Sequence, residues 1–515
     1  MNFNLLPKVG ILAAVSLVAG GISTATAADP YDKALEARVA ALERELNLMQ
    51  GDDKGKAVKP ADVPTFLRAK GANVKELVMY GDLRYRWQYT NFQNQLNPNE
   101  TNPAAVYSHD NGNSRNRYRL RFGFEYQLTD NFFMGFAFGS GADNGNDGTT
   151  ASFTNGFSKQ SVWIDKAYLG YKFKDINLTI IAGKQNFPFY AIDDFVYNPA
   201  DTRPEGFTEI YKLDLTSAAS ITFIAGQYIF FDNNEFNNSA GLSKGVKTDA
   251  YLFMQQAVFE FKFGGTGDST RTVQDGKTTR TEKVAGSPAM SLKFGPTFQF
   301  YPNSGNVTTA TANSNPINGI NNVAGFGSAY GNATRNLLVF DMPAEFNFKI
   351  GGIAIKPYAE IAYNFQGGAR AYNVYGVRAD NWSDKSAWMA GVKFGNLAKK
   401  GDWSFSADYR SVGVGSIDPN LNDPNWAGSR LNMQGPKVAL AYRFTNWLTG
   451  NINFYSAWNL RSNLRPSAVL GAATSPAVLP APGVATATFK NTKVGIVPFD
   501  YNAQQIVQIE LNATF

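Results

Sequence analysis

The 515-residue chain has no cysteine and only one histidine, His109. Without cysteine the fold does not depend on disulfide bonds, and the protein carries no lipid on an N-terminal cysteine. A hydrolytic site needs a placed base beside a nucleophile, but His109 follows a polar stretch with no serine or cysteine nucleophile pattern. We therefore interpret His109 as a surface residue in a polar loop and expect no enzyme activity.

A metal or cofactor site is also not expected. Residues 143–148 have the composition of a calcium loop, but glycine occupies the third position and no glutamate closes the motif. The formal charge of +6 comes from basic residues spread at strand spacing rather than clustered. This spacing does not favour nucleic acid as a partner.

No hydrophobic run after residue 28 reaches the roughly 20 residues that a membrane-spanning helix needs. Before it, Lys8 precedes a short apolar run at residues 9–22, which ends in Ala25-Thr26-Ala27. This order is typical of a secretory signal peptide, and we expect cleavage after residue 27. The mature chain is then either exported and soluble or a membrane β-barrel.

Residues 28–50 carry a heptad stripe whose apolar members are Leu35, Val39, Leu42, Leu46 and Met49. Such a short helix is marginal alone, so association in an oligomeric coiled coil is one interpretation. A single helix lying against the rest of the protein is the other. Residues 51–74, with several glycines, prolines and lysines, predict a linker before a final domain at residues 75–515.

Residues 115–128 alternate strictly between two kinds of side chain. The even positions from 118 to 128 are aromatic or leucine, whereas the odd positions include Arg115, Arg117, Arg119 and Arg121. A tight turn at residues 129–131 leads into a second alternating stretch at 132–139. A period of two places one set on each face of a strand, so this hairpin predicts a wall between lipid and water.

The same alternation recurs to the C-terminus, in pairs of segments joined by short turns. Counting segments predicts an all-β fold, a transmembrane antiparallel barrel of about 16 strands, with 14 or 18 as alternatives because bacterial barrels have even numbers. The long polar stretches belong on the outer side: 90–114, 141–160, 302–334, 366–385, 412–434 and 459–502. Residues 264–288 fit least well, because they form a long stretch on the short-turn side.

The last twelve residues alternate in the same way and end at Phe515. A terminal apolar strand that pairs with the first strand leaves no open edge in lipid. A C-terminal phenylalanine after alternate apolar residues resembles the signal that the outer-membrane assembly machinery recognises. We therefore expect an outer-membrane protein of a Gram-negative bacterium, in contact with membrane lipid.

The inward positions carry about twice as many bases as acids, and Arg84 and Arg86 join the four arginines of residues 115–121. A lumen biased in this way attracts anions, and guanidinium groups bind phosphate or carboxylate oxygens. We predict that these six arginines, which we term the arginine row, line the pore and set its selectivity. The alternative is that they are ordinary wall charges paired with acids across the lumen.

A stretch after the fifth expected strand carries a more specific pattern, Gly183-Lys-x-x-x-Pro-Phe189 followed by an acidic, aromatic loop that closes in Pro204-Glu205-Gly206. It resembles the "putative porins" of Gram-negative outer membranes, a family related in design to phosphate-selective porins. The resemblance implies a 16-stranded channel, often trimeric, with a loop folded into the lumen. It places these residues near the constriction: Asp193, Asp194, Asp201, Arg203 and Glu205.

Four acids and one base in this loop depart from a strongly anion-selective pattern and predict a transverse field against the arginine row. An external loop packed on the rim is the alternative. We expect a passive porin for small hydrophilic solutes, assembled as a homotrimer. A plugged structural or adhesive barrel is the alternative function, and a channel specific for phosphate, sugar or organic anions is a third.

Overall fold

The computed structural model describes residues 76–95, 109–141, 149–153, 159–231, 250–265, 269–275, 278–284, 288–302, 336–375, 379–419, 421–461 and 503–515. The expected signal peptide, N-terminal helix and linker lie outside these residues, as does most of the expected loop at 302–334. No helix in the described ranges has the length and hydrophobicity needed to cross a membrane.

The described residues are mainly strands. The strands are β1 (Glu76–Gln95), β2 (His109–Gln127), β3 (Phe132–Ser140), β4 (Thr150–Ser152), β5 (Val162–Phe173), β6 (Leu178–Lys184), β7 (Glu205–Thr216), β8 (Ala219–Phe231), β9 (Ala250–Gly265), β10 (Ser269–Asp275), β11 (Thr278–Val284), β12 (Pro288–Phe294), β13 (Thr297–Phe300), β14 (Leu338–Ile350), β15 (Ile353–Asn364), β16 (Ser386–Gly395), β17 (Trp403–Val412), β18 (Met433–Arg443), β19 (Leu448–Asn459) and β20 (Ala503–Thr514). The helices are α5 (Gly367–Tyr375) and α6 (Trp382–Lys385), with 3₁₀ turns η3 (Lys174–Ile176) and η5 (Ala427–Ser429).

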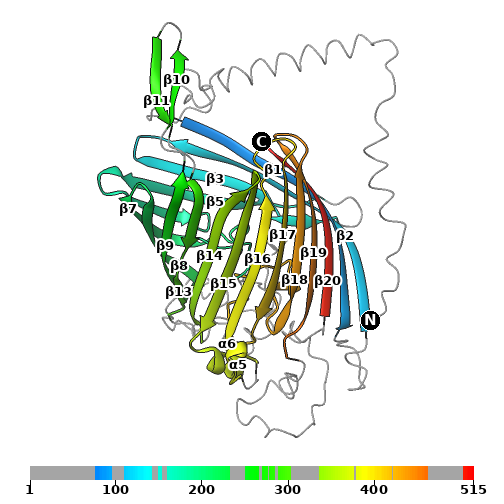
Figure 1. Cartoon of the computed structure of the whole chain (residues 1–515). Helices are drawn as coiled ribbons and strands as arrows, with labels where there is room; N and C mark the ends of the chain where they lie inside the picture. Colours follow the sequence, from blue (N-terminus) through cyan, green and yellow to red (C-terminus); the bar gives the residue numbers. More distant parts are fainter. Residues whose placement is uncertain are drawn as a thin grey trace, which may run out of the picture. The chain divides into compact units, whose positions relative to one another are not determined.

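All strands except β10 and β11 belong to one antiparallel sheet in which neighbours in sequence are paired. The sheet closes because β20, red in Figure 1, pairs with β1 from Asp82↔Thr514 to Gln93↔Ala503. β4 continues β3 along β2, and β13 continues β12 along both β9 and β14. With these two pairs each counted as one interrupted strand, the described residues form a sixteen-stranded barrel, which confirms the predicted fold class.

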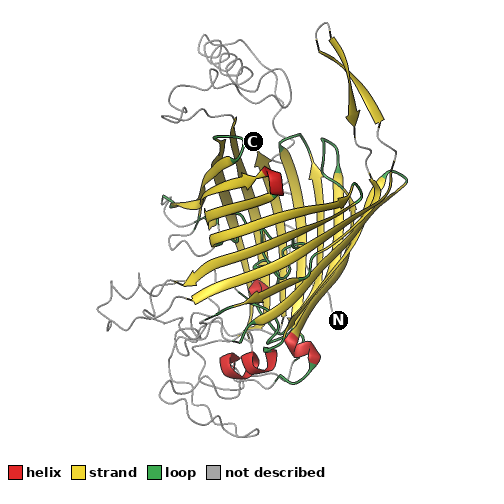
Figure 2. Cartoon of the chain, turned by 90° about the vertical axis from the view of Figure 1, so that its left-hand side faces the viewer, coloured by secondary structure: helices red, strands yellow, loops and turns green. Residues whose placement is uncertain are grey.

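The connections alternate between short turns and long segments, as expected from the sequence. A backbone hydrogen bond of 3.0 Å from Leu128 to Phe132 closes the β2–β3 turn, and one of 2.9 Å from Phe444 to Leu448 closes the β18–β19 turn. The segment that fitted least well, residues 264–288, contains the separate two-stranded sheet of β10 and β11, seen as a distinct hairpin in Figure 2. The β9–β12 connection therefore carries an added hairpin on the short-turn side.

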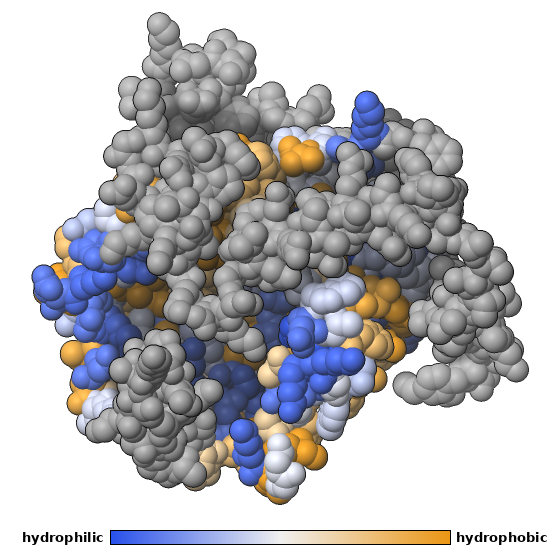
Figure 3. Space-filling view, turned by 90° about the horizontal axis from the view of Figure 1, so that it is seen from above, coloured by the Kyte–Doolittle hydropathy of each residue, from blue (hydrophilic) through white to orange (hydrophobic). Residues whose placement is uncertain are grey.

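The wall of the barrel buries its polar face and exposes its apolar face. On β1, Arg84 and Arg86 are 8% and 5% exposed, whereas Leu83 and Tyr85 between them are 50% and 43% exposed. Figure 3, seen from above, shows hydrophilic and hydrophobic side chains mixed along the rim, and hydrophilic side chains in the uncovered part of the hollow. An apolar band outside and a charged interior are what a barrel in lipid requires.

Two sequence expectations are wrong. His109 is not in a loop but is the first residue of β2, and β1 extends to Gln95, so these strands are longer than their apolar alternation. Residues 412–434 do not form an outer loop: their described part is almost entirely buried, with Ile417 at 0% and Trp426 at 2% exposure. These apolar side chains leave water by folding into the barrel.

Candidate functional site

Two loops fold into the lumen from the side of the long connections. Loop A is residues 185–204, between β6 and β7, and loop B is residues 413–432, between β17 and β18, of which residue 420 is not described. Aromatic residues of loop A, including Phe195 and Tyr197, belong to the same buried cluster as Ile417 and Trp426 of loop B. The two loops meet where the backbone N–H of Asn198 donates a hydrogen bond of 2.6 Å to the backbone carbonyl of Leu421.

The entry and the turn of loop A follow from its local sequence. Gly183, just before the loop, has φ +115°, and a Cβ there would lie 2.4 Å from a backbone oxygen of β5, so only glycine fits. Asp193 and Asp194 both adopt left-handed φ values of 49° and 56°, which aspartate tolerates better than most residues. Of the two side chains, that of Asp193 bonds to the barrel wall and that of Asp194 lines the open cavity.

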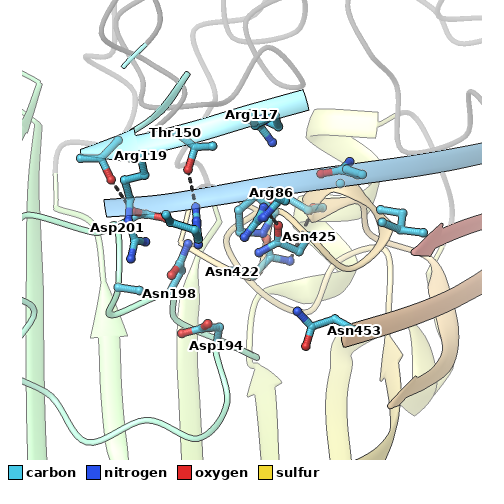
Figure 4. A pocket seen from close by; sticks show the side chains of 18 of the residues that line it. Arg86, Arg117, Arg119, Thr150, Asp194, Asn198, Asp201, Asn422, Asn425 and Asn453 are labelled. Carbon is cyan, nitrogen blue, oxygen red and sulfur yellow. Dashed lines mark hydrogen bonds between the residues drawn. The ribbon is translucent and has the colours of Figure 1, made fainter. Parts of the chain in front are cut away.

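Between the loops and the β1–β2 wall lies a cavity of about 700 Å³. Among the residues that the structure describes, nine basic side chains line it: Arg84, Arg86, Arg115, Arg117, Arg119, Lys184, Arg203, Arg430 and Lys437. Four acidic side chains also line it: Asp165, Asp194, Asp201 and Glu510. Figure 4 shows the arginines on the two strands at one side and Asp194, Asn198 and Asn422 of the loops at the other.

The arginines of β1 share a single carboxylate. Arg86 forms an ion pair with Glu510 of β20, and the Arg84 Nη1 atom lies 3.9 Å from the same carboxylate. Arg84 also donates to the Thr150 hydroxyl at 2.5 Å, while Arg86 donates to the Asn425 amide of loop B at 2.9 Å. Two buried cations with one anion leave a surplus of positive charge at this wall.

Two arginines of β2, Arg119 and Arg121, each have an acidic partner of their own. The Arg119 Nε atom lies 2.7 Å from Asp82 Oδ1, and Arg121 pairs with Asp201 of loop A while donating to Thr149 at 2.8 Å. Arg121 therefore ties loop A to the wall rather than lining the cavity. The structure thus brings five of the six predicted arginines to the cavity and gives the sixth an anchoring contact.

The C-terminal end of loop A is anchored through a β-bulge. The register between β3 and β5 shifts between Ala137 and Phe138, so the consecutive residues Asp165 and Lys166 are both buried. Asp165 accepts a hydrogen bond of 3.2 Å from the Arg203 Nε atom. Strict alternation would have placed these two neighbours on opposite faces, so the bulge supplies an anchor that the period of two does not predict.

The remaining predicted residues are placed apart from the cavity. Glu205 is the first residue of β7 and pairs with Lys184 across the entrance to loop A. Asp193 is turned toward β17 and β18, where it contacts Arg410 and Lys437. Phe515 lies at the closing seam, where its amide donates to the Gly81 carbonyl at 3.1 Å.

The three aspartates of loop A have different acidities. Burial raises the pKa of Asp194 to about 7, and the negative charge of Asp423 adds to this effect. Burial acts in the same direction on the other two, but Lys437 and Arg410 outweigh it and lower the pKa of Asp193 to about 2. Arg121 likewise lowers the pKa of Asp201 below its ordinary value. Asp194 is therefore the acid of this loop that titrates near neutral pH.

Loop B was not predicted from the sequence, and neither were the positions of Asn422, Asp423 and Asn425 in the lumen. The signal was present in the apolar residues of a stretch read as an outer loop, which include Ile417, Leu421, Trp426 and Leu431. An outer polar loop has no reason to carry four large apolar side chains at short intervals, and these residues are those that bury against loop A.

A closed barrel with an apolar outer band and a charged, loop-narrowed lumen defines an outer-membrane channel. Residues 68–471 match the family model described as "Putative porin", and the chain belongs to this family. No curated protein matches the chain. As members of this family are channels, the protein is a porin and not an enzyme.

The chain is also similar to solved porin structures, at low sequence identity. The chain is 10% identical to OmpF of Salmonella typhi in complex with daunomycin, with a TM-score of 0.42, covering 86% of this chain and 98% of that one. It is 12% identical to OprB of Pseudomonas putida, with a TM-score of 0.40, covering 85% and 94%. It is 11% identical to the outer membrane channel DcaP of Acinetobacter baumannii, with a TM-score of 0.38, covering 90% and 100%.

Proposed function

We propose that this porin is a passive diffusion channel that prefers small hydrophilic anions. The observation that carries the proposal is that, in the part of the chain that the structure describes, nine basic but only four acidic side chains surround the cavity. An excess of fixed positive charge concentrates anions at a narrow point and repels cations. Neither a cofactor nor a chemical step is required, because solutes move down their own gradients.

The arginine row and loop A would act together at the constriction. Arg86 on one side and Asp194 on the other lie across the cavity shown in Figure 4, and Arg84 of the same strand also lines this cavity. A field directed across the passage orients dipolar solutes while the net charge still favours anions. This arrangement supports a general diffusion pore with an anion preference rather than a filter for one ion.

The reversal potential in a salt gradient across a planar bilayer tests the preference. Arg84→Gln removes a cavity cation that has no close carboxylate of its own, so the reversal potential should shift toward the potassium equilibrium potential. Lys212→Gln is the matched control, because Lys212 is 55% exposed and pairs with Asp214 on β7. If Arg84→Gln leaves the reversal potential unchanged, the arginine row does not set the selectivity of the channel.

The tight packing of the two loops favours one other function, a plugged structural barrel. Their aromatic cluster fills part of the lumen, although the cavity beside it stays open. A plugged barrel gives no steady ohmic steps in planar bilayers, whereas a porin does. A channel built for phosphate would instead show saturable block of chloride current as phosphate is added.

We also propose that the mature protein is exported through a cleaved signal peptide at residues 1–27 and forms a homotrimer. The heptad stripe in residues 28–50 supports the trimer, and light scattering of detergent-extracted protein with and without residues 28–50 tests it. Phe515 at the end of β20 supports recognition by the assembly machinery. Removing Phe515 should then lower the amount of barrel that reaches the outer membrane, while Thr514→Ser should not.

A further inference from the structure

Arg410 on β17 is fully buried, and its guanidinium contacts three carboxylates from three parts of the chain. The Nε atom donates to Asp408 of the same strand at 2.7 Å, and Nη1 donates to Asp423 of loop B at 2.9 Å. Nη2 donates to both the backbone carbonyl and the carboxylate of Asp193 in loop A, each at 3.0 Å. One side chain thus holds both inward loops against the wall.

Neighbouring groups complete this cluster, which we term the clamp: Asp193, Asp408, Arg410, Asp423 and Lys437. Lys437 of β18 donates to the same Asp193 carboxylate at 2.7 Å, so loop A is held by two adjacent strands. Asp408, which is itself fully buried, also accepts a hydrogen bond of 3.1 Å from Tyr358. Two cations and three carboxylates give the clamp one negative charge in excess, and each of the three carboxylates has a cation within hydrogen-bond distance.

The chemistry of the clamp requires arginine at position 410. Three nitrogens of one planar group point in fixed directions toward three carboxylates, whereas the single ammonium of lysine cannot reach all three at once. The guanidinium carbon also lies 5.7 Å from the centre of the Phe195 ring, which fixes the plane of the group against loop A. The side chain is 0% exposed, so it makes no contact with a passing solute.

Other contacts hold each loop at a different point. Gln256 of β9 binds the backbone of Tyr190 in loop A, with distances of 2.7 Å and 2.8 Å, and Arg203 anchors the end of that loop. Arg86 holds loop B at Asn425. These anchors lie on one loop each, whereas Arg410 joins both loops and the wall through one group.

We propose that Arg410 is a positioning residue that sets the bore of the channel by fixing loops A and B to each other and to β17. This proposal rests on the proposed channel function. Without the guanidinium, the carboxylates of Asp408 and Asp423 remain buried without their shared cation. They repel each other and recruit water, and the loops move away from the wall and from each other.

Single-channel conductance and neutral-sugar permeation in proteoliposomes test the proposal. Arg410→Gln should raise the conductance by roughly half or more, increase open-channel noise and admit larger sugars, because current through a porin is set at its narrowest point. The conductance of Arg410→Lys should lie between those of Arg410→Gln and the wild type, since lysine keeps the charge but loses two of the three contacts. Lys212→Gln is again the matched control and should behave as the wild type.

A folded Arg410→Gln barrel with wild-type conductance and sugar cut-off would overturn the proposal. If that variant does not fold, Asp423→Asn removes one arm of the clamp on loop B and should produce a smaller change in the same direction. An Asp423→Asn protein with unchanged conductance would then overturn it.

A cross-link separates positioning from general loosening of the barrel. The chain has no cysteine, so Asn198→Cys and Leu421→Cys place a single pair where the loops already meet. In the Arg410→Gln background, oxidation of this pair should restore the conductance of the oxidised double-cysteine protein that keeps Arg410, and reduction should abolish the restoration. A conductance that stays high after complete oxidation would contradict the proposal. The reversal potential of the wild type tests the anion preference separately.

Discussion

We predict that Asp194 makes the selectivity of this channel sensitive to pH. It lines the cavity, and burial together with the charge of Asp423 raises its pKa to about 7. Lys437 lowers this pKa, and Asp193 and Asp201, which stay charged, raise it. Because the group loses its proton as the pH rises through about 7, negative charge appears in the cavity above that pH, and anion preference should fall.

The size of the effect follows from the charge count. With Asp194 protonated, nine bases stand against three acids around the cavity, and ionisation adds a fourth acid. A unit charge acts on an ion about 7 Å away with about 0.6 kcal/mol in water. Salt at about 0.1 M reduces this interaction energy to about half, since the screening length is about 10 Å. Anions and cations feel opposite signs, so their permeability ratio should change about threefold between pH 5 and pH 9.

The assay is the reversal potential in a potassium chloride gradient, measured from pH 5 to pH 9 in bilayers of zwitterionic lipid. Asp194→Asn should remove the pH dependence and hold the selectivity at its acidic value. Asp214→Asn is the matched control, because Asp214 is 56% exposed, pairs with Lys212 and lies outside the cavity. If Asp194→Asn keeps the same midpoint near pH 7, another group controls the titration and the reasoning is refuted.

Three further predictions concern stability and folding. Glu510→Gln should lower the stability of the barrel by about 3 kcal/mol, because it leaves two buried guanidiniums without their shared carboxylate, and the temperature of the heat-induced gel shift reports this. Arg203→Ala should expose the end of loop A to chymotrypsin, whereas unchanged digestion would show that the pair with Asp165 is not an anchor. Gly183→Ala should reduce the yield of refolded barrel, since a Cβ there would lie 2.4 Å from the backbone of the neighbouring strand. A wild-type yield would show that the backbone relaxes there at little cost.

The wall of the barrel was predictable because a local rule controls it. A period of two assigns each strand residue to a face, so Arg84 and Arg86 could be placed inward and Leu83 and Tyr85 outward without knowing their partners. The strand count followed from the same rule. The rule fails where the register changes, as at Asp165, because a bulge depends on the neighbouring strand.

The interior was not predictable in the same way. The contact between Asp193 and Arg410 joins residues 217 positions apart, and no local pattern encodes such a pairing. Loop B has the glycine, asparagine and proline of an outer loop, and its apolar residues find a partner only because loop A already occupies the lumen. Contacts between residues far apart in the sequence determine where a long loop packs. The sequence therefore predicted a constriction by loop A, but it predicted neither the inward packing of loop B nor the clamp.

We propose that an open passage with an excess of positive charge runs past the arginines of β1 and β2. The reversal potential of the wild-type protein in a tenfold gradient of potassium chloride at pH 6 tests it most directly. We predict steady ohmic channels whose reversal potential lies toward the chloride equilibrium potential. A potential on the potassium side would contradict the claim, as would the absence of conductance from correctly folded barrels.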